Sequence, residues 1–162
     1  MQRCQQNKRE NVKKYLPKEY QAEYERKVKA AYAMNEYEDA RKALRGVVRD
    51  RQRINISAAE SLEEGFEETL ALHRLGIPPV LRVSFSTTNL IESSSSRVRT
   101  VMRNVKRWRS GTNQTQRWTA TALLEAEKRF RKVKGYKSMS VLKSALEGAT
   151  IKQSTTQQHN AA

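Results

Sequence analysis

Residues 17–49 read PKEYQAEYERKVKAAYAMNEYEDARKALRGVVR, and this stretch decides the fold class. Its apolar residues recur every three or four positions, which is the period of an amphipathic helix and not the alternation of a strand. Pro17 suits the start of the first helix, because the first helical N–H has no partner within the helix. The two apolar stripes are Tyr20, Tyr24, Val28, Ala31, Tyr32, and then Tyr37, Ala40, Leu44, Val47, Val48 in a helix from about Glu36 to Arg49. The sequence predicts a mostly α-helical protein.

Helical periodicity continues on the C-terminal side. Ser57 and Glu60 have the spacing of a capping box, and they predict a helix that ends near Gly76 with the apolar stripe Leu62, Phe66, Leu70 and Leu72. The pair Pro78 and Pro79 predicts an irregular connection. Further helices are expected over 89–103, 114–133 and 138–146, with Gly135 ending the second, and the tail from residue 148, rich in Gln and Thr, is expected to be disordered.

The charge of the chain points to a polyanionic partner. Its 162 residues hold 32 Lys and Arg against 17 Asp and Glu, a formal charge of +15. The charge is uneven, because residues 54–92 carry a net −4 whereas residues 97–134 carry a net +10. We expect the polyanion-binding surface in the second stretch, and nucleic acid is the first candidate.

Composition also sets the expected compartment. Cys4 is the single cysteine, so no intrachain disulfide can form and a cytoplasmic protein is expected. The N-terminal residues are polar and basic, unlike a signal peptide, and no apolar run approaches the length of a membrane span. No membrane association is expected.

The segment Thr87-Thr88-Asn89-Leu90-Ile91-Glu92 places one carboxylate at a helix start, just before the most basic part of the chain. Such a carboxylate could hold Mg²⁺ against DNA phosphates. Asn89 and Glu92 also have the spacing of an N-cap and its partner, so Glu92 could instead satisfy backbone donors of its own helix. The residues alone leave both roles open.

The basic stretch after Glu92 is dense in arginine, which binds phosphate with a planar pair of donors. Phosphate contacts are expected from Arg97, Arg99, Arg103, Lys106, Arg107, Arg109 and Arg117. A solvated charged face is the alternative. Trp108 and Trp118 are expected in the core rather than as stacking platforms, and Trp118 shares an apolar stripe with Leu123, Ala126 and Phe130.

Several stretches together resemble the Mutator-type transposases, a DDE family of bacterial insertion sequences. The segment ending in Glu92 resembles the signature around the last catalytic acid of that family. Resemblance extends in order from Gln2 to Leu146, through Gln2-Arg3-Cys4, Leu75-Gly76-Ile77-Pro78-Pro79, Asn104-Val105-Lys106-Arg107-Trp108-Arg109, and Glu125-Ala126-Glu127-Lys128-Arg129-Phe130-Arg131.

The resemblance implies a ribonuclease H-like catalytic domain with a helical insertion between its second and third acids. On this interpretation residues 1–11 are the end of a core strand, 12–85 the insertion, 86–147 the C-terminal helices, and 148–162 a disordered tail. Glu92 is then the third catalytic acid and a metal ligand. Two Mg²⁺ ions in the complete enzyme would activate water or a DNA 3′-hydroxyl, and the enzyme would act as a homo-oligomer on the ends of an insertion element.

The chain departs from the family pattern in two ways. Asn7 stands where the family usually has a histidine after the cysteine, and two histidines cannot complete a zinc site, so Cys4 is expected to be a small buried residue. The family's two aspartates would lie upstream of Gln2, while Asp39 and Asp50 match no motif and are expected on the surface. A fragment that binds DNA without retaining the ions or cleaving is therefore predicted, with the central sheet largely missing.

Two other functions account for the charge. A stand-alone basic helical protein could bind nucleic acid without any catalytic ancestry, although this does not explain the context of Glu92. A structural subunit that binds acidic proteins would be expected to use lysine more than a dense run of arginine.

Overall fold

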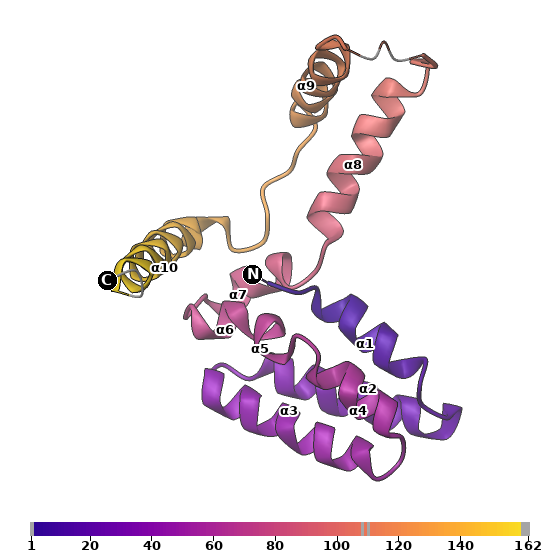
Figure 1. Cartoon of the computed structure of the whole chain (residues 1–162), viewed down its shortest axis with the longest axis vertical. Coiled ribbons are helices and arrows are strands. Elements are labelled where there is room, and N and C mark those ends of the chain that lie inside the picture. The colour runs from indigo at the N-terminus through magenta and orange to yellow at the C-terminus, as the bar shows by residue number, and fades with distance from the viewer. Residues whose placement is uncertain (1, 108, 110, 160–162) are drawn as a thin grey trace. The chain divides into compact units, whose positions relative to one another are not determined.

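The computed structural model describes residues 2–107, 109 and 111–159, with side chains as far as Ala149 (Figure 1). All regular elements in this described part are helices, as the sequence predicted. The chain divides into two compact units. Residues 1–87 and 134–162 form one, here called the bundle unit, and residues 88–133 form the other, here called the hairpin unit.

The bundle unit is built on four helices, each packed against two of the others. Helix α1 contacts α2, α2 contacts α3, α3 contacts α4, and α4 returns to α1. Three shorter helices, α5 to α7, follow in the chain. The bounds are α1 Gln5–Lys13, α2 Lys18–Ala33, α3 Tyr37–Gln52, α4 Ile56–Glu63, α5 Phe66–Thr69, α6 Ala71–Arg74 and α7 Pro79–Phe85.

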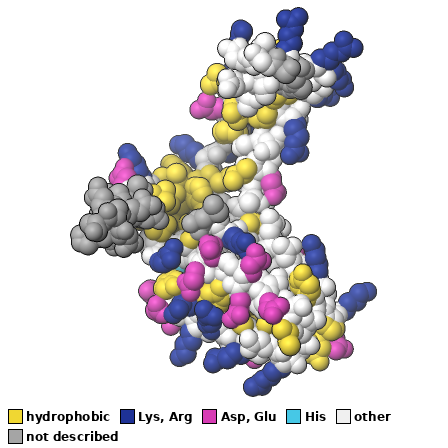
Figure 2. All heavy atoms as spheres, in the orientation of Figure 1, with side chains coloured by type: hydrophobic (Ala, Val, Ile, Leu, Met, Phe, Trp, Pro, Cys, Tyr) yellow, Lys and Arg dark blue, Asp and Glu magenta, His cyan; other side chains and the backbone are white. Residues whose placement is uncertain are grey.

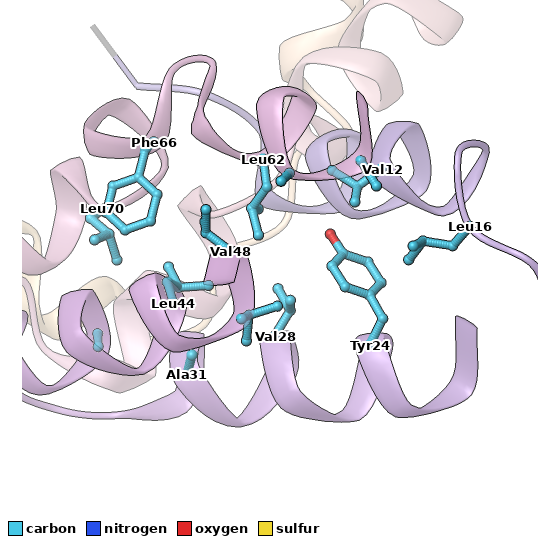
Figure 3. Packing of buried hydrophobic residues seen from close by; sticks show 14 residues of the cluster. Val12, Leu16, Tyr24, Val28, Ala31, Leu44, Val48, Leu62, Phe66 and Leu70 are labelled. Atoms are coloured by element: carbon cyan, nitrogen blue, oxygen red, sulfur yellow. The ribbon is translucent and has the colours of Figure 1, made fainter. Parts of the chain in front are cut away.

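The predicted apolar stripes meet in the core of this bundle. Tyr24 rises from α2 toward Val12 of α1, while Leu44 of α3 lies near Val28 and Ala31 (Figure 3). All of these side chains are almost fully buried. Burial of a Leu or Val stabilises a fold by roughly 1.5–3 kcal/mol, so this cluster is the main source of stability for the bundle.

The region from Asn55 to Gly76 differs from the single capped helix that the sequence predicted. Asn55, not Ser57, is the N-cap of α4, and its Oδ1 accepts from the Ala58 amide at 3.2 Å. Gly65 then takes φ +65°, a left-handed conformation that ends one helix and begins the next. Leu62, Phe66, Leu70 and Leu72 are nevertheless all buried as predicted, on three short helices instead of one.

Buried basic side chains cover two helix C-termini in the bundle unit. Lys8 Nζ donates to the carbonyl oxygens of Ser61 and Glu64 at the end of α4. Arg82 donates to the carbonyls of Met34 and Asn35 just beyond α2, at 3.0 and 3.3 Å. The last carbonyls of a helix lack partners within it and carry partial negative charge. These cations therefore neutralise helix ends and are removed from the surface.

The sequence predicts the end of a strand over residues 1–11, but the described residues of this segment form no strand. Residues 2–4 are extended, and α1 begins at Gln5. Backbone hydrogen bonds tie this segment to α5 and α7, from the Arg3 amide to the Glu68 carbonyl at 3.1 Å and from the Gln5 amide to the Ser86 carbonyl at 2.8 Å. The start of the chain is thus part of the bundle unit.

The connection after Gly76 is also more regular than predicted, because Pro79 opens α7 at the position where helices tolerate proline. Gly135 packs on this helix, where an added Cβ would lie 2.8 Å from the Leu81 nitrogen. Helices η1 (Tyr136–Ser138) and α10 (Met139–His159) follow. Helix α10 extends past the expected end at Leu146, through most of the predicted disordered tail, and residues 160–162 of that tail lie outside the described part.

The hairpin unit consists of two helices that pack on each other, α8 (Asn89–Met102) and α9 (Gln114–Glu127). Helix α8 begins at the predicted residue and ends one residue before the predicted Arg103. Helix α9 stops at Glu127, although a helix to residue 133 was predicted with Gly135 ending it. Continuing it would bring Lys128 within one turn of Arg131 and Lys132, and like charges at this spacing destabilise a helix. No helix in the described part is long and apolar enough to cross a lipid bilayer.

Replacing Lys8 with methionine should lower the free energy of unfolding by about 1–3 kcal/mol, because two buried carbonyls at the end of α4 lose their donor. Lys18→Met is the matched control, since Lys18 is exposed at the start of α2. Urea denaturation followed by circular dichroism measures both. Equal stability of the two variants would show that the Lys8 amine does not stabilise the bundle.

The buried His73 should make the bundle unit less stable in mild acid. Its Nε2 lies 3.1 Å from the Tyr32 carbonyl oxygen, and burial, aided by the Arg82 charge, lowers the pKa of its imidazole. The unfolded chain takes up a proton near pH 6.5 while the folded one resists it, so stability falls as the pH drops below that value. Between pH 7.5 and 5.5 wild type should lose about 1.4 kcal/mol at most relative to His73→Gln. An equal loss of unfolding free energy in wild type and in His73→Gln over this pH range would contradict the prediction.

Candidate nucleic-acid interface

The carboxylate of Glu92 is held in the first turn of α8 by a side chain and not by backbone amides. Thr88 is the N-cap residue, and its hydroxyl donates to Glu92 Oε1 at 2.6 Å. Asn89 is the first helical residue, so it is not the N-cap that the alternative role of Glu92 required. Glu92 is exposed to solvent. One oxygen of the carboxylate is therefore fixed in position while the group stays accessible.

Helix α8 buries no residue fully. Its hydroxyl side chains bond to its own backbone, with Ser94 donating to the Leu90 carbonyl at 2.9 Å and Thr100 to the Ser96 carbonyl at 3.1 Å. Hydroxyl groups that are bonded in this way present a small and polar surface. Such a helix surface leaves room for the sugar-phosphate backbone of a nucleic acid to approach.

The predicted DNA-binding side chains keep their positive charge uncompensated. Among the described residues, no carboxylate lies within 4.0 Å of any of the seven cations, namely Arg97, Arg99, Arg103, Lys106, Arg107, Arg109 and Arg117. All of them are exposed except Arg97, which is half-buried. The hairpin unit has one acidic side chain in a described ion pair, Glu125, and its partner is Lys128 at 2.6 Å.

In the bundle unit, by contrast, basic side chains form ion pairs with carboxylates. The amines of Lys13 and Lys29 lie 3.5 and 2.7 Å from carboxylate oxygens of Glu25, and the Arg41 Nε lies 3.0 Å from Glu67 Oε1. Figure 2 shows the result, since acidic and basic side chains are interspersed on the visible face of the bundle, whereas the α8–α9 region carries basic side chains with few acidic ones. An anion would therefore be attracted chiefly to the hairpin unit.

A hollow of about 580 Å³ lies where the loop after α8 meets the start of α9. Its lining includes the side chains of Arg109, Asn113, Arg117, Trp118 and Thr121. The loop is held in place by Gln114, whose Oε1 accepts from the Arg109 amide at 2.9 Å. This hollow brings together two of the predicted DNA-binding residues, Arg109 and Arg117, and no sequence motif predicted it.

Trp118 lines this hollow and is 41% exposed, so the prediction that it lies in the core is wrong. Leu123 of α9 and Phe130, which follows the end of α9, are likewise exposed. Ala122 and Ala126 are the α9 residues that are buried. Small side chains let two helices pack closely, which explains why the larger residues of α9 remain outside the contact. Trp108 lies outside the described residues.

A second hollow, of about 610 Å³, runs between α8 and α9 and contains Arg99. Leu90, Ile91, Val98 and Leu123 line it, which makes its wall largely apolar. Of the predicted cations, then, Arg109 and Arg117 share one hollow and Arg99 lines another.

The described residues do not form a complete metal site, because no three His, Cys, Asp or Glu side chains come together among them. Asp50 of α3 forms an ion pair with Lys27 of α2 at 2.7 Å, and Asp39 is an exposed residue of α3. Cys4 is partly exposed, not buried as predicted, and its Sγ accepts from the Asn7 amide at 3.4 Å as the N-cap of α1. The donors that the structure describes therefore do not by themselves make up a two-ion centre, to which Glu92 would supply one ligand.

Comparison with known proteins identifies the family. The family model described as "Transposase, Mutator family" matches residues 1–132, which covers the bundle helices, Glu92 and all seven predicted cations. Searches of curated proteins and of solved structures returned no match. Because the match extends over most of the sequence, the chain belongs to the Mutator family of transposases.

Proposed function

We propose that this chain serves DNA transposition by binding DNA through the basic surface of the hairpin unit. The observation that carries the proposal is the set of seven cations without a carboxylate partner, located in a chain of a transposase family. Each phosphate neutralised by such a group releases condensed counterions, which supplies most of the affinity of a protein for DNA backbone. The target would be the ends of an insertion element.

Two features favour DNA over an acidic protein as the partner. Six of the seven cations are arginines, whose planar guanidinium donates two parallel hydrogen bonds to a phosphate. The hydroxyl-rich surface of α8 and the exposed Trp118 add groups that contact sugar and base. A stand-alone nucleic-acid-binding protein without catalytic ancestry is disfavoured by membership of the family.

For Glu92 we propose the role of the third acid of a ribonuclease H-like transposase domain. The contact with the Thr88 hydroxyl supports this, because it orients the carboxylate and leaves its second oxygen open. The residues Thr88 and Glu92 belong to the segment that resembles the family's last catalytic motif. With one suitably placed acid and no described metal cluster, the 162-residue chain binds DNA but neither nicks nor joins it.

DNA binding by the chain should depend steeply on salt. Six or so phosphate contacts predict a slope of about −5 in a plot of log affinity against log salt concentration. Replacing Arg103 and Lys106 with glutamine should reduce that slope by about 2, since each lost contact removes about 0.9. The matched control is Lys42→Gln with Arg49→Gln, which removes the same charge from exposed positions on α3. A slope near zero, or an equal loss in the control, would refute the proposed surface.

In Mg²⁺ or Mn²⁺ the purified chain should not cleave a DNA duplex above background. The assay compares wild type with Glu92→Gln and with Glu127→Gln, which alters an exposed acid on α9. Specific cleavage that disappears in Glu92→Gln and persists in Glu127→Gln would show that the chain assembles a working catalytic centre.

A further inference from the structure

The hollow at the start of α9 combines three kinds of group that face the same space. Trp118 offers an aromatic ring that is 41% exposed, Arg109 and Arg117 offer guanidinium groups, and Asn113 and Thr121 offer polar side chains. Its volume of about 580 Å³ lies within the usual range of roughly 300–1,000 Å³ for small-ligand sites. Tryptophan is enriched at binding interfaces because it combines a large apolar ring with a polar N–H.

From this arrangement we infer that the hollow receives an unstacked nucleotide of single-stranded DNA. Trp118 stacks on the face of the base, and Arg109 and Arg117 bind the phosphates on either side of it. The inference rests on the proposed function and makes it more specific, because it names the form of DNA that the hairpin unit binds. A base within a duplex shows neither of its faces, so the site accepts a strand end, a gap or an opened stretch.

The construction of the hollow supports this assignment. Gln114 Oε1 accepts from the Arg109 amide, and Thr112 donates to the Arg109 carbonyl at 3.1 Å, so Arg109 is held beside the start of α9. Trp118 lies four residues after Gln114 and therefore on the same side of the helix. Arg117 has no carboxylate within 4.0 Å in the described part of the chain, which leaves its guanidinium able to bind phosphate.

Base stacking on an aromatic side chain tolerates any base sequence, because every base presents a π face. The hollow therefore confers preference for unpaired DNA rather than for a sequence. Asn113 makes no capping hydrogen bond with α9, so its amide can contact the edge of the bound base. A base-edge contact of this kind would add a modest sequence preference at one position.

The experiment compares a single-stranded oligonucleotide with an abasic oligonucleotide of the same length, which has the same phosphates and no bases. Wild type should bind the first about tenfold more tightly at equal salt, as expected for one stacked base. Trp118→Ala should lose this preference and bind the two oligonucleotides equally, while its salt slope, which counts phosphate contacts, stays that of wild type. Phe130→Ala is the matched control, because Phe130 is an exposed aromatic of the same unit outside the hollow. It should keep the preference.

A second measurement does not depend on a substitution at Trp118. In the Trp108→Phe variant, Trp118 is the one remaining tryptophan, and its fluorescence should be quenched by the normal oligonucleotide and not by the abasic one. Equal binding of both oligonucleotides by wild type, or quenching by both, would overturn the inference. Salt-dependent DNA binding with no effect of base removal would overturn the inference alone, whereas absence of DNA binding would overturn the proposed function as well.

Discussion

Ion pairing determines where this chain carries charge that an external partner can use. In the bundle unit, carboxylates such as Glu25 and Glu67 lie within salt-bridge distance of lysines and arginines, and Lys8 and Arg82 are buried against helix ends. In the hairpin unit the chain supplies few acids, so the seven cations from Arg97 to Arg117 have no carboxylate within salt-bridge distance among the described residues. A charge that is already paired gains little from a phosphate, because binding would have to break the existing contact. The usable positive charge is therefore concentrated on α8, α9 and the loop between them.

This division explains why a high net charge alone is a poor guide to the binding surface. Residues 1–53 hold fifteen basic groups, more than the twelve of residues 97–134. The difference lies in the eight acids of the first stretch against two in the second. The bundle thus serves as a stable scaffold, and the segment that follows Glu92 is left to contact the anion.

The sequence predicted the helical fold class and most of the core, because a periodic apolar stripe is a strong signal over four or five turns. Leu44, Val48 and Tyr24 are buried where the period placed them. Helix ends were predicted less well, since they depend on single residues. Gly65 divides what looked like one helix, and Asn55 caps α4 in place of Ser57. The burial of Lys8, Arg51 and Arg82 could not be predicted, because it depends on which distant carbonyl or carboxylate each cation reaches in the folded chain.

The candidate site was predicted in part. The order of residues around Glu92 and the arginine run predicts the region, and the matched family model spans it without assigning roles to its residues. The hollow beside Trp118 depends on a loop held by Gln114, a contact that has no sequence signature. The most direct test of the central claim is an NMR titration of the isotope-labelled chain with a DNA duplex. The account predicts that resonances of residues 88–133 shift while those of the bundle helices stay in place. Shifts concentrated on α1 to α3 would contradict it.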